Sequence, residues 1–172
     1  MSIFNTTNFE RQGNKKNDLH LESNEETCEA IVNLSENTLR SLKIFTPDLE
    51  HKLYDNEKFV QNILNFVRGN RHAQVQVLVS DISHSIKYGH RLLRLSQQLT
   101  SAMQIRITPE EYRETTISFI QLDQSNFIFK PDSSNQYAIQ SNCKSRSNSL
   151  LEFFTPAWDQ AQKSPQSQIF HI

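Results

Sequence analysis

Five polar side chains occupy positions from which they could bind an anion. Asp48 and Asp81 each follow a predicted buried strand. His84, His90 and Arg91 belong to the helix predicted after the second of these strands. An arginine guanidinium forms two parallel hydrogen bonds with a phosphate or carboxylate group. In open α/β folds the ligand binds beside the carboxyl ends of the strands, where these residues are expected. The pattern therefore predicts a pocket for a small anionic ligand.

A structural role explains the same residues. Asp81 and Ser83 can each cap a helix by accepting a hydrogen bond from an unpaired backbone N–H group of its first turn. His84, Lys87 and Arg94 would then lie on a basic helix face that is exposed to solvent. Both interpretations stay open at the level of the sequence.

Metal, cofactor and nucleophilic chemistry have little support. His84 and His90 lie about 120° apart on a helix, so with Asp81 they would not converge on one ion as an i, i+4 pair does. The 3 glycines of the whole chain rule out a Walker loop or a GxGxxG cradle. No serine or cysteine nucleophile stands beside a histidine in a recognisable motif. We therefore expect no metal, no cofactor and no catalysis.

The candidate residues depend on an alternation of strands and helices. The run from Val75 to Val79 is typical of a strand buried on both faces. Apolar side chains at helical spacing from Ser83 to Met103 predict one long amphipathic helix after it. With the segments around it, this unit gives strand, helix, strand, helix, strand, helix and strand over residues 19–108.

The second half of the chain has a different pattern. Residues 117–122 and 127–129 predict a hairpin, and residues 137–139 a further strand. A Ser/Asn-rich loop over residues 141–149 and a final amphipathic helix over residues 150–161 follow. The predicted fold is α/β, a single domain over residues 19–172 whose mixed, mainly parallel sheet is flanked by helices. A disordered tail over residues 1–18 precedes it.

Composition favours a cytoplasmic protein. Of 172 residues 36% are hydrophobic, and 18 Lys+Arg against 19 Asp+Glu give a net charge of −1, which demands neither nucleic acid nor an acidic membrane as partner. The two cysteines form no paired motif, and no stretch has the apolar length of a signal peptide or a membrane span. We do not expect nucleic-acid binding, because the basic residues available to it lack exposed aromatic partners. These residues are Arg68, Arg71, His72, Lys87, Arg91 and Arg94.

The element order, together with residues 116–123, resembles one half of the phospholipase D fold. That superfamily carries the motif H-x-K-x4-D, in which the histidine is the nucleophile and the lysine holds phosphate. Aligning Asp123 with the aspartate of the motif places Thr116 at the histidine and Ser118 at the lysine. The resemblance implies a degenerate site in which Asp123 survives as a ligand-binding residue and phospholipase-type hydrolysis is lost.

Three segments are also similar to a bacterial domain of uncharacterised function that often follows a GNAT acetyltransferase domain: KIFTPDLEHKLYD, VLVSDISHSIKYGHRLLRLSQQL and LLEFFTPAWDQA. We therefore predict a non-catalytic module that binds a ligand or a protein, with an acetyltransferase as one candidate partner and no membrane partner. Because single-copy phospholipase D-like domains pair to complete a site, the resemblance also suggests a homodimer. The alternative is a phosphodiesterase or nuclease-type hydrolase, or a nucleic-acid-binding protein, that uses Asp123, His90 and Arg91 in an altered site.

Overall fold

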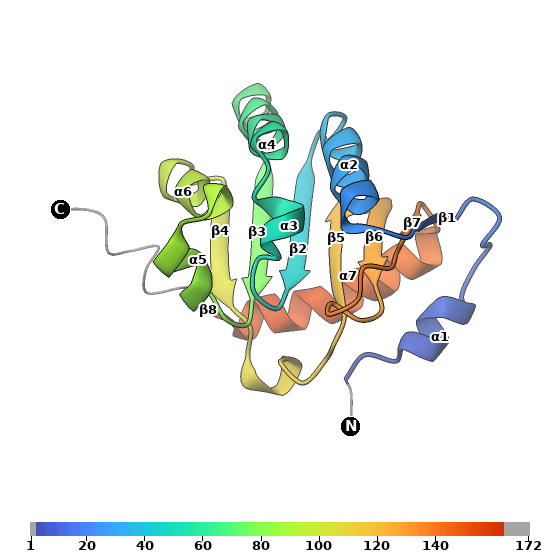
Figure 1. Ribbon diagram of the computed structural model, residues 1–172. Coiled ribbons are helices and arrows are strands. Elements are labelled where there is room, and N and C mark those ends of the chain that lie inside the picture. The colour runs from blue at the N-terminus through green and yellow to red at the C-terminus, as the bar shows by residue number, and fades with distance from the viewer. Residues whose placement is uncertain (1–2, 164–172) are drawn as a thin grey trace.

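The computed structural model describes residues 3–163, which form one mixed sheet with helices on both faces (Figure 1). The strands are β1 (Leu19–Leu21), β2 (Ser41–Thr46), β3 (Gln74–Val79), β4 (Met103–Ile107), β5 (Ser118–Leu122), β6 (Asn126–Lys130), β7 (Ala138–Ser141) and β8 (Gln162–Lys163). The helices are α1 (Thr6–Arg11), α2 (Asn24–Ser35), α3 (His51–Tyr54), α4 (Glu57–Gly69), α5 (Ser83–Tyr88), α6 (Arg91–Gln98) and α7 (Lys144–Gln160), with a 3-10 turn at Glu110–Tyr112. The predicted α/β class, single domain and mixed sheet are confirmed.

The sheet is largely antiparallel, so the predicted predominance of parallel strands is wrong. Its strand order is β1-β7-β6-β5-β2-β3-β4-β8, and among the described strands only the pairs β2–β3 and β3–β4 are parallel. β5 and β6 are joined by a tight turn in which Asp123 and Gln124 have positive φ angles of 54° and 63°. A tight turn can join only antiparallel neighbours, so the chain after β4 builds a meander instead of crossing over through helices.

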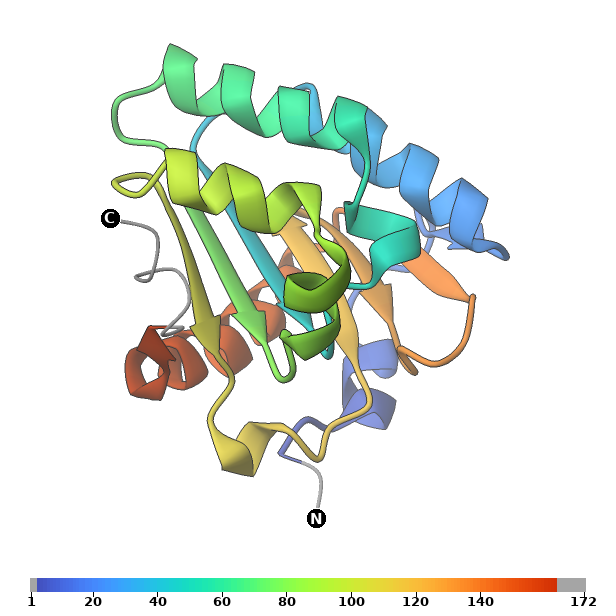
Figure 2. The same ribbon diagram turned by 60° about the vertical axis from the view of Figure 1, so that its left-hand side comes forward.

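Different helices cover the two faces of the sheet. α2, α4 and α6 pack on one face, together with Ile44, Val77 and Ile120, and α1 and α7 pack on the other, together with Phe45 and Phe119 (Figures 1 and 2). Successive side chains of a strand point to opposite faces, so the central strands contribute to both apolar layers. Burial on both faces is the reason for the nearly continuous apolar runs in the sequence.

The single helix predicted from Ser83 to Met103 is divided into α5 and α6. Gly89 lies between them with φ 81° and ψ 150°, a conformation that only glycine adopts readily, and His90 then caps α6. α6 keeps its apolar stripe against the sheet. α5 turns away from it, so Tyr88 is 66% exposed although its spacing predicts a place on the apolar face.

Residues 3–18, here called the N-terminal arm, are ordered where the sequence predicts a disordered tail. Asn5 caps α1 by accepting a hydrogen bond from the Asn8 backbone N–H at 2.9 Å. Phe4 and Phe9 are buried, and their rings lie 5.7 Å and 4.4 Å from the ring of Phe129. The arm is polar on average, and its order comes from two rings that dock on an aromatic layer formed by residues more than a hundred positions later. Local composition does not contain that information.

Helix α7 begins at Lys144, so the loop predicted over residues 141–149 is wrong. A stretch rich in serine and asparagine favours a loop unless its polar side chains find partners inside the protein. Here Gln121 Nε2 donates to the Ser147 carbonyl oxygen and to Ser147 Oγ, at 2.8 Å and 2.7 Å. Tertiary hydrogen bonds therefore extend the helix beyond its apolar part.

No helix within residues 3–163 is long and apolar enough to cross a membrane. Residues 164–172, which the sequence assigns to the domain, lie outside the described residues. The domain boundary at residue 19 stays a prediction.

Gly89→Ala should lower the free energy of unfolding by about 1–3 kcal/mol, because alanine would have to adopt a strained backbone conformation. A Cβ at this position meets no atom within 4 Å, so backbone strain is the whole cost. Gly69→Ala is the matched control: its surroundings are equally open and its φ is not positive, so alanine should raise the free energy of unfolding by about 0.4–1 kcal/mol. Urea denaturation followed by circular dichroism measures both, and equal changes would contradict the strain at Gly89.

Candidate ligand-binding site

A candidate site lies where β2 and β6 end and β5 begins. Because β5 is antiparallel to both neighbours, Thr46, Ser118 and Lys130 come to the same edge of the sheet. Ser118 and Lys130 are register partners. By the alternation along each strand, all three side chains point to the face covered by α2, α4 and α6. This edge contains the carboxyl ends of the parallel strands, where the sequence predicts the ligand.

Lys130 supplies the positive charge at this edge. Its Nζ forms an ion pair with Glu50 Oε1 at 2.9 Å and donates to the Ser133 carbonyl oxygen at 3.3 Å. The other carboxylate oxygen of Glu50 accepts a hydrogen bond from Thr46 Oγ1 at 3.1 Å. The side chains of Lys130 and Glu50 are only 6% and 9% exposed, so each charge depends on the other. Burial, with a smaller contribution from the Glu50 carboxylate, raises the pKa of the neighbouring Tyr54 well above its usual value.

The loop after β2 aims Glu50 at Lys130. Leu49 and Glu50 have positive φ angles of 67° and 28°, which residues with side chains seldom adopt. Asp48 Oδ1 accepts a hydrogen bond from the Glu50 backbone N–H at 3.0 Å, and His90 Nε2 lies 3.2 Å from the Leu49 carbonyl oxygen. Backbone strain held in this way by side chains is typical of functional sites.

A hollow of about 450 Å³ opens over the ion pair. Its wall includes Lys130, Glu50, Asp48 and residues 133–136. A buried hydroxyl group at the same sheet edge, Ser118 Oγ, has no hydrogen-bond partner within the described part of the chain. Since buried polar groups are normally hydrogen-bonded, the edge has unused capacity to bind polar groups.

Asp48 and His90 are the predicted ligand residues that the structure brings to this loop. Both act on its conformation: Asp48 bonds to the backbone of Glu50, and His90 holds Leu49. Asp48 also lies in the wall of the hollow, whereas His90 is buried with 1% of its surface exposed. Both predicted residues therefore shape the loop that carries the charged group, and their role as ligand residues stays a prediction.

Asp81, His84 and Arg91 have other roles. Asp81 Oδ1 accepts a hydrogen bond from the Ser83 backbone N–H at 2.8 Å, and the bonds from Ser83 lower the pKa of this carboxyl group. His84 is exposed, and its ring centroid lies 4.6 Å from that of Tyr88. The Arg91 side chain is 47% exposed and forms its ion pair with Asp55 at 3.4 Å. Asp81 thus bonds to the backbone two residues ahead, while α5 has no side-chain cap, and His84 lies on an exposed helix face.

Asp123 lies at the opposite edge of the sheet. Its carboxylate accepts hydrogen bonds from the backbone N–H groups of residues 39–41, at 2.9 Å, 2.7 Å and 3.0 Å. These residues lead into β2, whereas the candidate site lies at its end. The length of β2 therefore separates Asp123 from His90 and Arg91, and the altered hydrolase site that would combine them is not assembled. Asp123 fixes the start of β2 to the β5–β6 turn.

One cluster of side chains consists of residue types that can bind a metal ion. Hydrogen bonds and ion pairs within the protein already account for its arrangement. His51, Asp55 and His90 place ligand-type atoms within 4.8 Å of one another. His90 Nδ1 accepts a hydrogen bond from the Leu92 backbone N–H at 3.1 Å, so Nε2 carries the proton that it shares with the loop carbonyl. Asp55 accepts a hydrogen bond from the Arg91 backbone N–H at 2.8 Å and contacts His51 Nδ1 at 3.1 Å. Both nitrogens of His90 are thus engaged, Nδ1 in capping α6 and Nε2 in holding the loop before α3.

Sequence reasoning missed Lys130 and Glu50. The available signal was a lysine at the end of a buried apolar strand, directly before Pro131, because such a charge requires a buried partner. The partner lies 80 residues away in sequence. No local pattern connects the two positions.

The sheet and its helices form a phospholipase D-like fold. Similar solved structures are the phospholipase D family member Nuc from Salmonella typhimurium (TM-score 0.55, 11% identity, covering 79% of this chain and 89% of Nuc) and NucT from Helicobacter pylori (TM-score 0.60, 6% identity, covering 86% of this chain and 98% of NucT). TrmBL2, an archaeal chromatin protein, has a TM-score of 0.65 at 8% identity, covering 95% of this chain. The chain spans 57% of the length of TrmBL2. At these identities the likeness shows the fold alone.

Within this fold class, the chain belongs to the family described as domain of unknown function DUF7931, whose family model matches residues 23–170. No curated protein sequence matches the chain. The family match begins after the N-terminal arm, so the candidate site lies inside the family domain and the arm lies outside it.

The free energy of unfolding should decrease as the pH is lowered from 7 to 5, because the unfolded chain binds a proton at His90 more readily than the folded chain does. Burial lowers the pKa of His90 below 6.5, and the nearby Asp55 carboxylate only partly offsets it, with His51 and Arg91 lowering the pKa further. The unfolded chain therefore takes up a proton first as the pH falls, and the stabilisation present above pH 6.5 is lost. His90→Asn, which can still cap α6, should flatten this dependence.

His84→Asn is the control, because His84 is exposed on α5. It should leave the wild-type pH dependence unchanged. The free energy of unfolding in urea at pH 7, 6 and 5 measures all three proteins. The same slope for His90→Asn and wild type would show that His90 is not the titrating group.

Proposed function

We propose that this chain is a non-catalytic module that binds a small phosphate-bearing ligand. The observation that carries the proposal is the position of Lys130 directly opposite Ser118 in the β5–β6 pair. In the phospholipase D superfamily the motif lysine holds phosphate, and Ser118 occupies that position in this chain. Directly opposite residues of an antiparallel pair lie side by side on one face, so Lys130 supplies an ammonium group to the same place from the next strand.

The chemistry of the edge favours binding without turnover. Thr116, at the position of the nucleophilic histidine, donates from Oγ1 to the Pro131 carbonyl oxygen at 3.2 Å. Ser118 Oγ has no hydrogen-bond partner within residues 3–163, so no base among them activates it. Lys130 forms a buried ion pair with Glu50, and a cation at this place suits the binding of an anion.

Glu50 acts as an internal competitor for the ligand. Its carboxylate occupies the groups that a phosphate would use, Lys130 Nζ and Thr46 Oγ1. A ligand must therefore displace Glu50, and the strained backbone of Leu49 and Glu50 lowers the cost of moving this loop. An acetyltransferase partner, a homodimer and a cytoplasmic location stay predictions from the sequence.

Thermal shift and isothermal titration calorimetry with inorganic phosphate and glycerol 3-phosphate test the proposal. Glu50→Gln should bind phosphate about 10–100-fold more tightly than wild type, since it removes the competing charge, and a charge-assisted hydrogen bond is worth about 1.5–3 kcal/mol. Lys130→Met should abolish the binding. Glu111→Gln, an exposed carboxylate outside the site, is the matched control and should bind as wild type does.

Two outcomes would contradict the proposal. If Glu50→Gln and Glu111→Gln bind phosphate with the same affinity, Glu50 does not compete for the site. If wild type hydrolyses bis(p-nitrophenyl) phosphate and Lys130→Met does not, the site is catalytic. Circular dichroism of Lys130→Met shows whether this variant has lost only phosphate binding or also its fold. If Lys130→Met does not fold, the comparison of Glu50→Gln with Glu111→Gln still decides the test.

Nucleic-acid binding is a second candidate, favoured by the exposed α5. Lys87 Nζ lies 5.1 Å from the centroid of the exposed Tyr88 ring, and the ring of His84 packs beside it. Exposed aromatic rings next to cations can stack on the bases of single strands and neutralise their phosphates. The structure of TrmBL2, which has a similar fold, shows a mode of DNA binding.

Tyr88→Ala should weaken binding of a labelled single-stranded oligonucleotide by about 5–150-fold, the loss of one stacked base at about 1–3 kcal/mol. Fluorescence anisotropy at 50 mM and 200 mM salt measures it, and the wild-type affinity should fall steeply with salt. Leu39→Ala, a large exposed side chain at the opposite edge of the sheet, is the control. Equal affinities for the two variants, or no salt dependence, would remove this candidate.

A further inference from the structure

The hollow over the Lys130–Glu50 ion pair has a polar wall. Its volume of about 450 Å³ lies within the range of small-molecule pockets. Most of the residues that line it carry amide, hydroxyl or charged side chains, and none of those described is Phe, Tyr or Trp. Such a wall suits the hydroxyl groups of a ligand, and it offers no ring on which a nucleobase could stack and little apolar surface for an acyl chain.

Two amide side chains line this hollow and have no partner in the protein. Neither the Asn24 nor the Gln136 side chain forms a hydrogen bond within residues 3–163. The β1–β7 pair brings them together: Leu21 is the register partner of Ala138, and from there the two chains continue to Asn24 and Gln136 at the same edge of the sheet. Each amide offers a carbonyl oxygen and an NH2 group, so each can accept a hydrogen bond from a hydroxyl group or donate one to it.

The loop that carries Gln136 is held in a fixed conformation. Asp132 Oδ1 accepts hydrogen bonds from the Ser134 backbone N–H at 2.9 Å and from Ser134 Oγ at 2.6 Å. The Ser133 carbonyl oxygen of the same loop accepts the hydrogen bond from Lys130 Nζ. The amide is thus presented at a set place relative to the cation, and a ligand that binds to both loses little free energy in ordering the loop.

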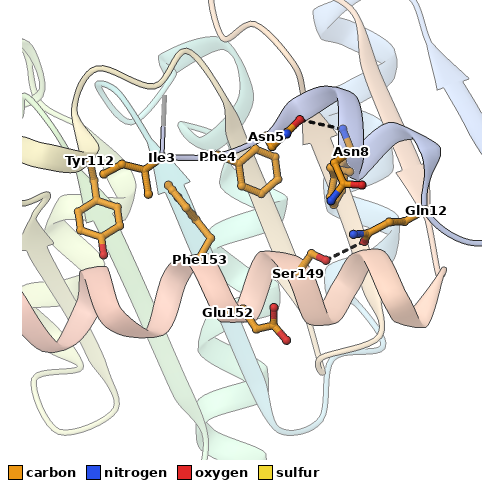
Figure 3. A pocket seen from close by; sticks show the side chains of 10 residues that line it. Ile3, Phe4, Asn5, Asn8, Gln12, Tyr112, Ser149, Glu152 and Phe153 are labelled. Atoms are coloured by element: carbon orange, nitrogen blue, oxygen red, sulfur yellow. Dashed lines mark hydrogen bonds between the residues drawn. The ribbon is translucent and has the colours of Figure 1, made fainter. Parts of the chain in front are cut away.

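The hollow under the N-terminal arm has the opposite character. It has a volume of about 300 Å³ and lies between the arm and α7, with the rings of Phe4, Tyr112 and Phe153 in its wall (Figure 3). Glu152 is the only charged residue among the described residues that line it. A hollow with one carboxylate and no cation does not suit a phosphate group, so the anion is assigned to the edge with Lys130.

A third hollow, of about 660 Å³, borders the candidate site and shares Asn24 and Lys52 with its wall. In this third wall three glutamates outnumber the two lysines: Glu25, Glu29 and Glu36 against Lys52 and Lys58. Carboxylates repel a second anionic group. The part of the ligand that points away from Lys130, toward these glutamates, is therefore expected to be neutral.

We propose that the ligand of the candidate site is the phosphate monoester of a small polyhydroxylated molecule, such as a sugar phosphate. Asn24 and Gln136 bind its hydroxyl groups, while its phosphate group pairs with Lys130. Binding of the phosphate by Lys130, as proposed above, is the precondition. Nucleotides and lipid phosphates carry the same anionic group, but the wall has no surface that matches a base or an acyl chain.

Isothermal titration calorimetry with three phosphate monoesters tests the class of ligand: n-butyl phosphate, glycerol 3-phosphate and D-ribose 5-phosphate. On both wild type and Glu50→Gln the affinity should rise in this order. D-ribose 5-phosphate should bind about 5–150-fold more tightly than n-butyl phosphate, because each amide adds at least one hydrogen bond. AMP should bind no more tightly than D-ribose 5-phosphate, because no ring in the wall stacks on its base.

Amide variants test which side chains bind the hydroxyl groups. Asn24→Ala and Gln136→Ala should each weaken the binding of D-ribose 5-phosphate about 2–10-fold and leave the affinity for n-butyl phosphate unchanged. Gln98→Ala is the matched control, because it removes an exposed amide at the end of α6. It should change neither affinity.

The outcomes separate the class of ligand from phosphate binding itself. If n-butyl phosphate binds as tightly as D-ribose 5-phosphate, or AMP binds more tightly, the phosphate site holds and the polyhydroxylated class is wrong. If both amide variants keep the wild-type affinity for D-ribose 5-phosphate, or lose affinity for both esters equally, the amides do not recognise hydroxyl groups. If no ester binds to wild type or to Glu50→Gln, phosphate binding fails and both proposals are wrong.

Discussion

The central strands of this protein are buried on both faces, and this constraint determines where every polar group of the candidate site can lie. Thr46, Ser118 and Lys130 lie next to the core residues Ile44, Ile120 and Ile128 on the same face of their strands, so on that face polar partners are available only where the strands end. A buried ammonium group at that position requires a buried carboxylate. The Lys130–Glu50 ion pair is the consequence, and the rest of the edge is arranged around it.

The ion pair imposes a conformation on the chain around it. Glu50 reaches Lys130 because two consecutive residues adopt positive φ angles, and His90 holds that loop from the start of α6. His90 can do so because the helix is broken at Gly89. The same break exposes Tyr88. One glycine conformation thus connects the loop that carries the charge with the exposed surface of α5.

Asp123 joins the β5–β6 turn to the start of β2. Its carboxylate binds three backbone N–H groups at the start of β2, which holds the β5–β6 turn against the parallel part of the sheet. At the other end of β5, Thr116 Oγ1 donates to the Pro131 carbonyl oxygen, and the cation of this edge comes from β6.

The sequence by itself determined the α/β class, the positions of most strands and the hairpin, because strand and helix periods are local properties of the chain. The tertiary structure alone decided the antiparallel character of the sheet, the break at Gly89, the order of the arm, the early start of α7 and the pairing of Lys130 with Glu50. Each of these depends on contacts between residues far apart in sequence, such as Phe9 with Phe129, and burial at such a contact outweighs local propensity.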